Sequence, residues 1–72
     1  MKATPQQMLR ELGYLTSSSG IASFQRDYNL FGSVPVMVSG ELDDDTVGAV
    51  RLAHKAREAF AVLRKRRSED RA

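Results

Sequence analysis

His54 is the only histidine in the sequence, and imidazole is the side chain that most often acts as a general base or metal ligand. Either role requires a suitable partner close by. Within helical reach of His54 lie only Arg51, Lys55 and Glu58. These neighbours favour a histidine on a solvated helix face over a catalytic base or a metal ligand.

Residues 43–45 are three consecutive aspartates, which could bind calcium. An EF-hand loop needs an oxygen ligand at its fifth position and glutamate at its twelfth. Counted from Asp43, those positions hold Val47 and His54. A helix that is capped by Asp43 explains the run better, because carboxylates stabilise the first turn of a helix. We therefore predict no metal site.

Nucleophilic and phosphate chemistry lack their usual residues. Ser17, Ser18 and Ser19 offer hydroxyl groups, but no histidine or lysine base is near them in the sequence. The chain has no cysteine, and no glycine-rich phosphate loop follows a strand pattern. The sequence thus predicts a protein that is not an enzyme and needs no cofactor.

The charge of the chain is divided between two regions. The 72 residues carry a net charge of +2. Up to Val50, three basic and six acidic residues give −3; from Arg51 onward, eight basic and three acidic residues give +5. The cations in the second region that could contact an anion are Arg57, Arg64, Lys65, Arg66 and Arg67.

This basic region has two interpretations. Its cations could contact the phosphates of a nucleic acid or an anionic membrane face. They could also form a solvated helix end that complements the helix dipole. No aromatic residues alternate with the cations to stack on bases, so nucleic-acid binding is the weaker hypothesis.

The spacing of apolar residues predicts helices that position these side chains. A first helix is expected from Pro5, capped by Thr4, to Gly13, which suits the left-handed end of a helix. A second helix is expected over residues 18–29. Valines alternate over residues 34–38, which indicates a short extended stretch or hairpin.

A long third helix is expected to follow the cap at Asp43 and to run unbroken to about residue 68. Gly48 is its only weak helix former. Its apolar stripe either folds back on residues 34–38 or meets another chain, including a second copy of this one. This candidate partner interface consists of Ala53, Ala56, Phe60 and Leu63.

Three segments carry motifs in a recognisable order: LGYL at 12–15, IASFQ at 21–25 and GELDDDTVGAV at 40–50. Together they resemble the peptidoglycan-binding-like domain family, whose helical module also occurs in matrix metalloproteinase propeptides. The resemblance covers residues 5–53 and implies an all-α fold, a small three-helix bundle, here with an extended C-terminal helix. The structural motif positions are Leu12, Gly13, Tyr14, Phe24, Gly40, Leu42, Asp43 and Thr46.

The sequence departs from the family pattern at three places. The loop at residues 16–20 is shortened, residues 31–38 contain an insertion, and about 20 residues follow the family's usual end. We therefore divide the chain into a module at 1–53 and a basic C-terminal helix extension and tail at 54–72. The absence of cysteine excludes the propeptide function.

The resemblance implies a non-catalytic module that binds bacterial peptidoglycan, including one supplied by a bacteriophage. The candidate ligand contacts are Tyr14, Ser17, Ser18, Gln25 and Asn29, and Gln25 is also expected to bridge to loop backbone. The alternative is a protein-interaction or assembly module that uses the C-terminal helix as its interface. A nucleic-acid-binding accessory is the third hypothesis.

The N-terminus carries no secretory pattern, because residues 1–7 contain no apolar stretch. No run of about 20 apolar residues predicts a membrane span. We expect a cytoplasmic or virion-associated protein that reaches the cell wall only when an assembly delivers it.

Overall fold

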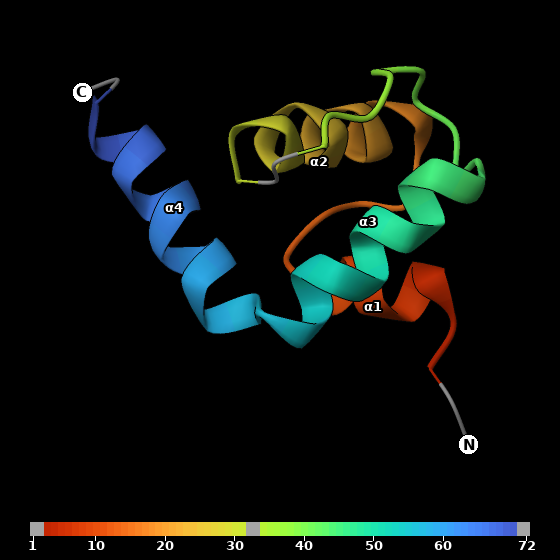
Figure 1. The fold of residues 1–72 in the computed structure, drawn as a ribbon, viewed down its shortest axis with the longest axis horizontal. Helices are drawn as coiled ribbons and strands as arrows, with labels where there is room; N and C mark the ends of the chain where they lie inside the picture. The colour runs from red at the N-terminus through yellow and green to blue at the C-terminus, as the bar shows by residue number, and fades with distance from the viewer. Residues whose placement is uncertain (1–2, 32–33, 71–72) are drawn as a thin grey trace.

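Four helices follow one another along the chain: α1 (Pro5–Glu11), α2 (Ser18–Phe31), α3 (Asp44–Lys55) and α4 (Arg57–Asp70) (Figure 1). The computed structural model describes residues 3–31 and 34–70, and side chains over residues 3–30, 34–62 and at Lys65. None of these described residues forms a strand, which confirms the predicted all-α class. Helix α3 contacts each of the other three helices, and α4 also contacts α2.

Helix α1 begins and ends where the sequence predicts. The Thr4 hydroxyl accepts the Gln7 N–H (3.1 Å), and the Gln7 side chain accepts the Thr4 N–H (3.0 Å), so the two residues form a capping box. At the other end Gly13 has φ 96°, a conformation that favours glycine. The Tyr14 N–H then donates to the Leu9 carbonyl (3.1 Å), which closes the helix and returns the chain to the core.

Helix α2 begins at Ser18 as predicted and ends at Phe31, two residues beyond the predicted end. The Ser17 carbonyl accepts the Ile21 N–H (2.9 Å), and the Ser17 hydroxyl accepts the Gly20 N–H (3.4 Å). Gly20 lies against the preceding loop: a Cβ atom there would be 2.1 Å from the Leu15 carbonyl oxygen. The first turn of α2 therefore requires glycine at this position.

The loop between α2 and α3 does not form the hairpin that was one of the two predictions for residues 34–38. Residues 34–40 contain no strand, and Val34 and Val38 are both exposed. Asn29 holds this loop, because its side-chain amide donates to the Val36 carbonyl (2.9 Å) and accepts the Val36 N–H (2.7 Å). The alternation of valines thus reflects one half-buried side chain, Val36, and not strand pairing. Residues 32 and 33 of the predicted insertion lie outside the described residues.

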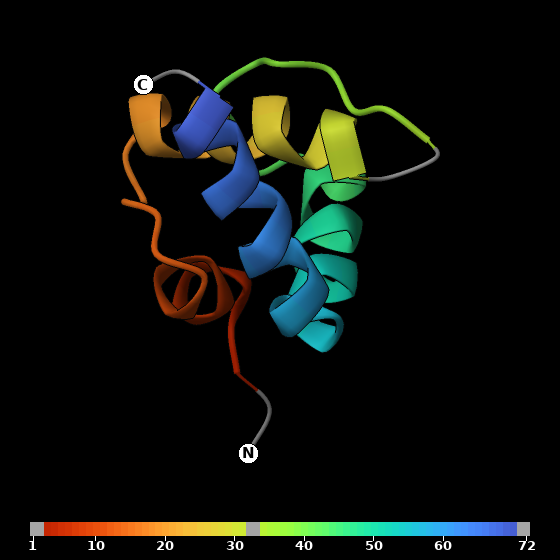
Figure 2. The same ribbon diagram turned by 90° about the vertical axis from the view of Figure 1, so that its left-hand side faces the viewer.

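The predicted third helix is wrong in one respect, because it does not continue to residue 68. The chain leaves helical geometry at Ala56, with φ −108° and ψ 37°, and α4 begins at the next residue. The predicted three-helix bundle with an extended third helix is therefore a four-helix arrangement. Figures 1 and 2 show α4 running at an angle to α3 along one side of the molecule.

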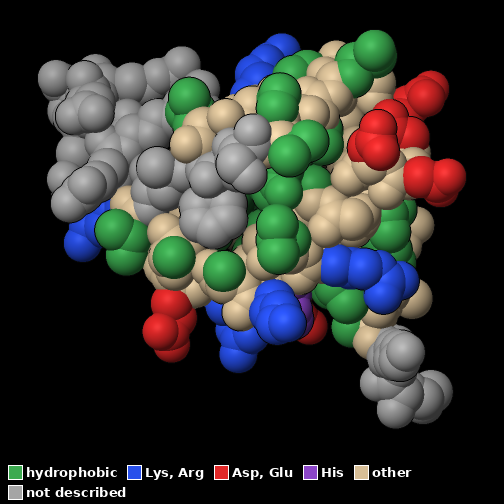
Figure 3. Space-filling view, in the orientation of Figure 1, with side chains coloured by type: hydrophobic (Ala, Val, Ile, Leu, Met, Phe, Trp, Pro, Cys, Tyr) green, Lys and Arg blue, Asp and Glu red, His purple; other side chains and the backbone are tan. Residues whose placement is uncertain are grey.

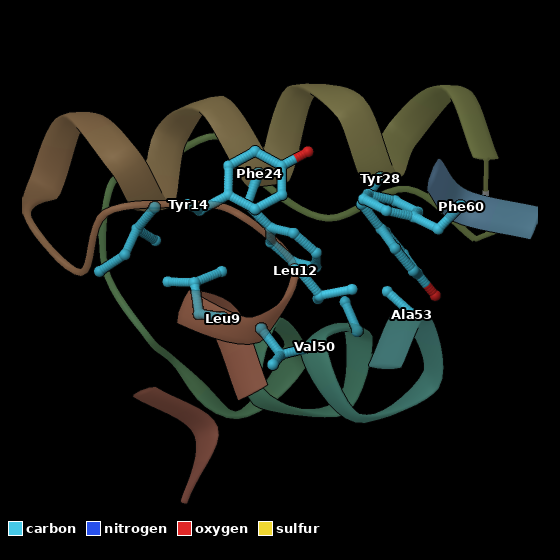
Figure 4. Packing of buried hydrophobic residues seen from close by; sticks show 10 residues of the cluster. Leu9, Leu12, Tyr14, Phe24, Tyr28, Val50, Ala53 and Phe60 are labelled. Carbon is cyan, nitrogen blue, oxygen red and sulfur yellow. The ribbon is translucent and has the colours of Figure 1, made fainter. Parts of the chain in front are cut away.

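The hydrophobic core explains this break. Phe60 is only 1% exposed and packs in the same cluster as residues of α1, α2 and α3 (Figure 4). Its ring centroid lies 5.8 Å from that of Phe24 and 6.3 Å from that of Tyr14. A straight continuation of α3 would carry Phe60 away from these rings. The buried hydrophobic cluster comprises Leu9, Leu12, Tyr14, Ile21, Phe24, Tyr28, Ala49, Val50, Ala53 and Phe60.

Candidate functional site

Gln25 is fully buried and connects three segments of the chain. Its Nε2 donates to Thr46 Oγ1 (2.8 Å) and approaches Ser39 Oγ and the Glu41 carbonyl oxygen at 3.2 Å each. Its Oε1 accepts the Gly40 N–H at 2.9 Å. The expected bridge from Gln25 to loop backbone is therefore confirmed. Because its amide is enclosed by these groups, Gln25 belongs to the interior of the protein and not to a ligand-binding surface.

Tyr14 is also an interior residue. Its ring is 7% exposed and meets Phe24 edge to face, with centroids 5.5 Å apart. Its hydroxyl donates to Asp27 Oδ2 at 2.5 Å, so the polar end of the ring is tied to α2. A ligand contact from the Tyr14 hydroxyl would compete with this part-buried hydrogen bond.

The other three predicted ligand contacts lie nearer the surface. Ser17 and Ser18 are exposed, and Ser17 Oγ lies 3.2 Å from Ser19 Oγ. Asn29 is half-buried, and both ends of its amide hold Val36. Of the five predicted residues, Ser17 and Ser18 are the two that the structure presents to solvent.

The turn before α3 matches its predicted chemistry. Asp43 Oδ1 accepts the Thr46 N–H at 2.8 Å, which is the expected N-cap. Hydrogen bonds from the Thr46 hydroxyl and N–H lower the pKa of the Asp43 carboxyl below its ordinary value, and a bond from Ser39 lowers it further. Gly40 has φ 75°, and a Cβ atom there would lie 2.5 Å from Ser18 Oγ. This turn therefore packs directly on the first turn of α2.

A surface cleft of about 300 Å³ lies between α1 and α4. Apolar and charged side chains line it together. Arg57 and Glu58 contribute charges of opposite sign from adjacent positions of α4. The Arg57 Nη1 also donates to the carbonyl oxygen of His54 (3.3 Å) at the end of α3. The lining residues are Glu11, Leu12, Arg57, Glu58, Phe60 and Ala61.

His54 has a partner beside this cleft that lies outside its own helix. Its Nε2 is 2.6 Å from Glu11 Oε1 on α1, and the His54 side chain is 21% exposed. This pair was not predicted from the sequence, because the two residues are 43 positions apart. No local spacing could indicate it; only the packing of α1 against α3 brings them together.

Two of the four residues of the predicted partner interface are buried within the chain. Ala53 and Phe60 are buried in the core, and Ala56 occupies the break between α3 and α4. Arg57 and Lys65 are exposed. The side chains of Leu63, Arg64, Arg66 and Arg67 lie outside the described residues, so the remaining interface and anion-contact predictions stay predictions.

Several large apolar side chains remain exposed. On the face seen in Figure 3, hydrophobic side chains are visible at many places, and acidic side chains gather at the end where α3 begins. Met37 is the most exposed of the large apolar side chains, at 78%. The full set in the described residues is Leu15, Leu30, Val34, Met37, Val38, Leu52 and Val62. Four of these lie between residues 30 and 38, so the end of α2 and the following loop form an apolar surface.

Within the described part of the chain, no group of histidine and carboxylate side chains could hold a metal ion. No helix there is long and apolar enough to span a membrane. Comparison with known proteins gives no match: no family model, curated protein or solved structure is significantly similar to this chain.

Proposed function

We propose that this protein is a non-catalytic module that binds bacterial peptidoglycan. One observation supports this most: the three motifs of the family resemblance meet in space. Gln25 of the second motif bonds to Gly40 and Thr46 of the third, and Phe24 packs on Tyr14 of the first. The three motifs, which are separate in the sequence, therefore share one set of interior contacts, and this supports the proposal.

The ligand surface in this proposal consists of two separate features. Ser17 and Ser18 at the start of α2 offer hydroxyl groups that can hydrogen-bond to glycan hydroxyls. The cleft between α1 and α4 offers carboxylates at Glu11 and Glu58 and a guanidinium at Arg57. These charges complement the ammonium and carboxylate groups of a short peptide attached to the glycan.

Sedimentation with purified peptidoglycan tests the proposal. The protein should be retained on peptidoglycan and not on cellulose. The double variant Arg57→Gln, Glu58→Gln should bind about tenfold more weakly, because two charge-assisted contacts are lost. A matched control is Glu41→Gln, Arg51→Gln, which removes the same charges from exposed positions that do not line the cleft. Equal retention on cellulose and peptidoglycan would disprove wall binding.

A second candidate function, docking in a larger protein assembly, is favoured by the apolar surface at the end of α2. Leu30, Val34 and Met37 are each more than half exposed, which is costly unless a partner covers them. The variant Leu30→Ser, Met37→Ser should keep its stability and lose association with the native assembly. Leu52→Ser, which changes a similarly exposed residue on α3, is the control.

A further inference from the structure

The break between α3 and α4 consists of one residue, and the sequence provides no reason for it. Residues 49–70 contain neither glycine nor proline. The residue at the break, Ala56, is an alanine, the residue type with the highest helix propensity. Two backbone hydrogen bonds with helical spacing persist at the break: Ala56 N–H to the Leu52 carbonyl (3.1 Å) and Phe60 N–H to the Ala56 carbonyl (3.0 Å). Local preference thus favours one continuous helix from Asp44 to Asp70.

Tertiary packing overcomes this preference at Phe60. The ring is 1% exposed and lies 5.8 Å, centroid to centroid, from Phe24, which is itself fully buried. Val62, two residues further along α4, is 56% exposed. Among the described side chains of α4, Phe60 is therefore the one that is anchored in the core.

If α3 and α4 formed one straight helix, Phe60 could not reach the core of its own chain. The 27 residues from Asp44 to Asp70 would extend about 40 Å at 1.5 Å per residue, which exceeds the 37 Å longest dimension of the whole molecule. The second half of such a helix would project beyond the body, and Phe60 would leave its site between Tyr14 and Phe24. That site would then be an open apolar slot shaped for a phenylalanine on a helix.

We propose that two copies of this chain exchange α4. In the exchanged dimer each α3–α4 segment is one continuous helix, and Phe60 of each copy fills the slot in the other. The core contacts of the closed monomer are retained, and the helix ends at the break regain their backbone partners. A one-residue connection that tertiary packing bends is the kind of hinge that permits such exchange. This inference does not depend on peptidoglycan binding.

Light scattering after size exclusion tests the exchange as protein concentration is raised. The dimer fraction should increase with concentration. Ala56→Gly should weaken the dimer about 10- to 30-fold, because glycine disfavours the continuous helix at two hinges per dimer. Ala61→Gly is the matched control: residue 61 is exposed and helical in both forms, so the substitution should leave the monomer–dimer equilibrium unchanged. A chain that stays monomeric up to millimolar concentration overturns the proposal.

Cross-linking distinguishes exchange from ordinary surface association. The chain has no cysteine, so single thiols can be placed without interference. Glu11 and Ala61 line the same cleft. A Glu11→Cys chain and an Ala61→Cys chain, refolded together and mildly oxidised, should form a mixed disulfide in the dimer fraction. Pairing of Lys55→Cys with Glu11→Cys is the control, because residue 55 precedes the hinge. Exchange is ruled out if the dimer forms no more of the Glu11→Cys to Ala61→Cys cross-link than of the control cross-link. It is also ruled out if Ala56→Gly leaves the dimer fraction unchanged.

Discussion

Two regions of the domain differ in how many interactions hold them in place: the body, which we define as residues 3–55, and the fourth helix, α4. In the body, α1 and α3 have side-chain caps, and Gln25 ties α2 to the turn before α3. Helix α4 starts without a cap side chain of the Ser, Thr, Asp or Asn type and is anchored in the core through Phe60. Many modest interactions therefore hold the body together, whereas one aromatic ring sets the direction of α4.

The largest loss of stability is expected when a methyl group is added at a close contact inside the body. Gly20→Ala would place a methyl group 2.1 Å from the Leu15 carbonyl oxygen, a backbone atom that cannot easily move. We expect a loss of at least about 3 kcal/mol in the free energy of unfolding, measured by urea denaturation. In Gly48→Ala the new methyl group meets nothing within 4 Å, and this control should gain about 0.5–1 kcal/mol. Equal effects of the two substitutions would contradict the close packing of α2 on its preceding loop.

The next largest effect tests whether α4 is a separate unit. Phe60→Ala removes the anchor and should cost about 3 kcal/mol, the cost of emptying a buried phenylalanine site. Hydrogen exchange should show that amides of α4 lose protection while those of α3 keep most of theirs. Val62→Ala, at an exposed position of the same helix, should change stability by less than about 0.5 kcal/mol. If α3 and α4 lose protection together, the body and α4 form one cooperative unit.

A smaller effect is expected at the polar centre of the body. Gln25→Leu keeps the size of the side chain but leaves the Gly40 N–H without its acceptor, and it should cost about 2 kcal/mol in urea unfolding. Gln6→Leu on the exposed face of α1 is the control and should be nearly neutral. A cost at Gln25 no larger than at Gln6 would mean that the amide does not hold α2 to α3.

The smallest effect concerns the pH dependence of the α3 cap. Because the folded-state pKa of Asp43 is below its ordinary value, its cap contributes stability above the unfolded-state pKa and loses it as pH falls through the folded-state pKa. Asp43→Asn keeps a capping oxygen but cannot titrate. Its melting temperature should therefore fall less steeply than that of the parent below about pH 4. If the melting temperatures of the two proteins fell equally with pH across this range, the lowered pKa of Asp43 would be contradicted.

The same contrast between body and α4 determines what could be predicted from the sequence. Thr4, Gly13 and Asp43 act on neighbouring residues, so the starts of α1 and α3 and the end of α1 were predictable. The break at Ala56 was not, since only the burial of Phe60 against distant residues produces it. The positions of the candidate site residues depend on the same distant contacts.

Two site residues illustrate this limit. Gln25 was correctly expected to reach loop backbone, but its partner Gly40 and its complete burial required knowledge of how α2 and α3 pack. His54 was judged by its helical neighbours alone, and its partner Glu11 lies on a different helix. The spacing of residues within one helix predicts which side chains of that helix lie close together. The residues that line a cleft between helices are brought together by tertiary structure.

The hydrogen bonds of Gln25 also have a consequence for the order of folding. They join residues only 14 to 21 positions apart, whereas the Glu11–His54 pair closes a separation of 43 positions. Shorter loops lose less chain entropy on closure, so we expect α2 and the start of α3 to be paired in the folding transition state before α1 docks. Kinetic φ-values for Gln25→Leu should then exceed those for Leu9→Ala in α1, and the reverse order would place α1 in the nucleus.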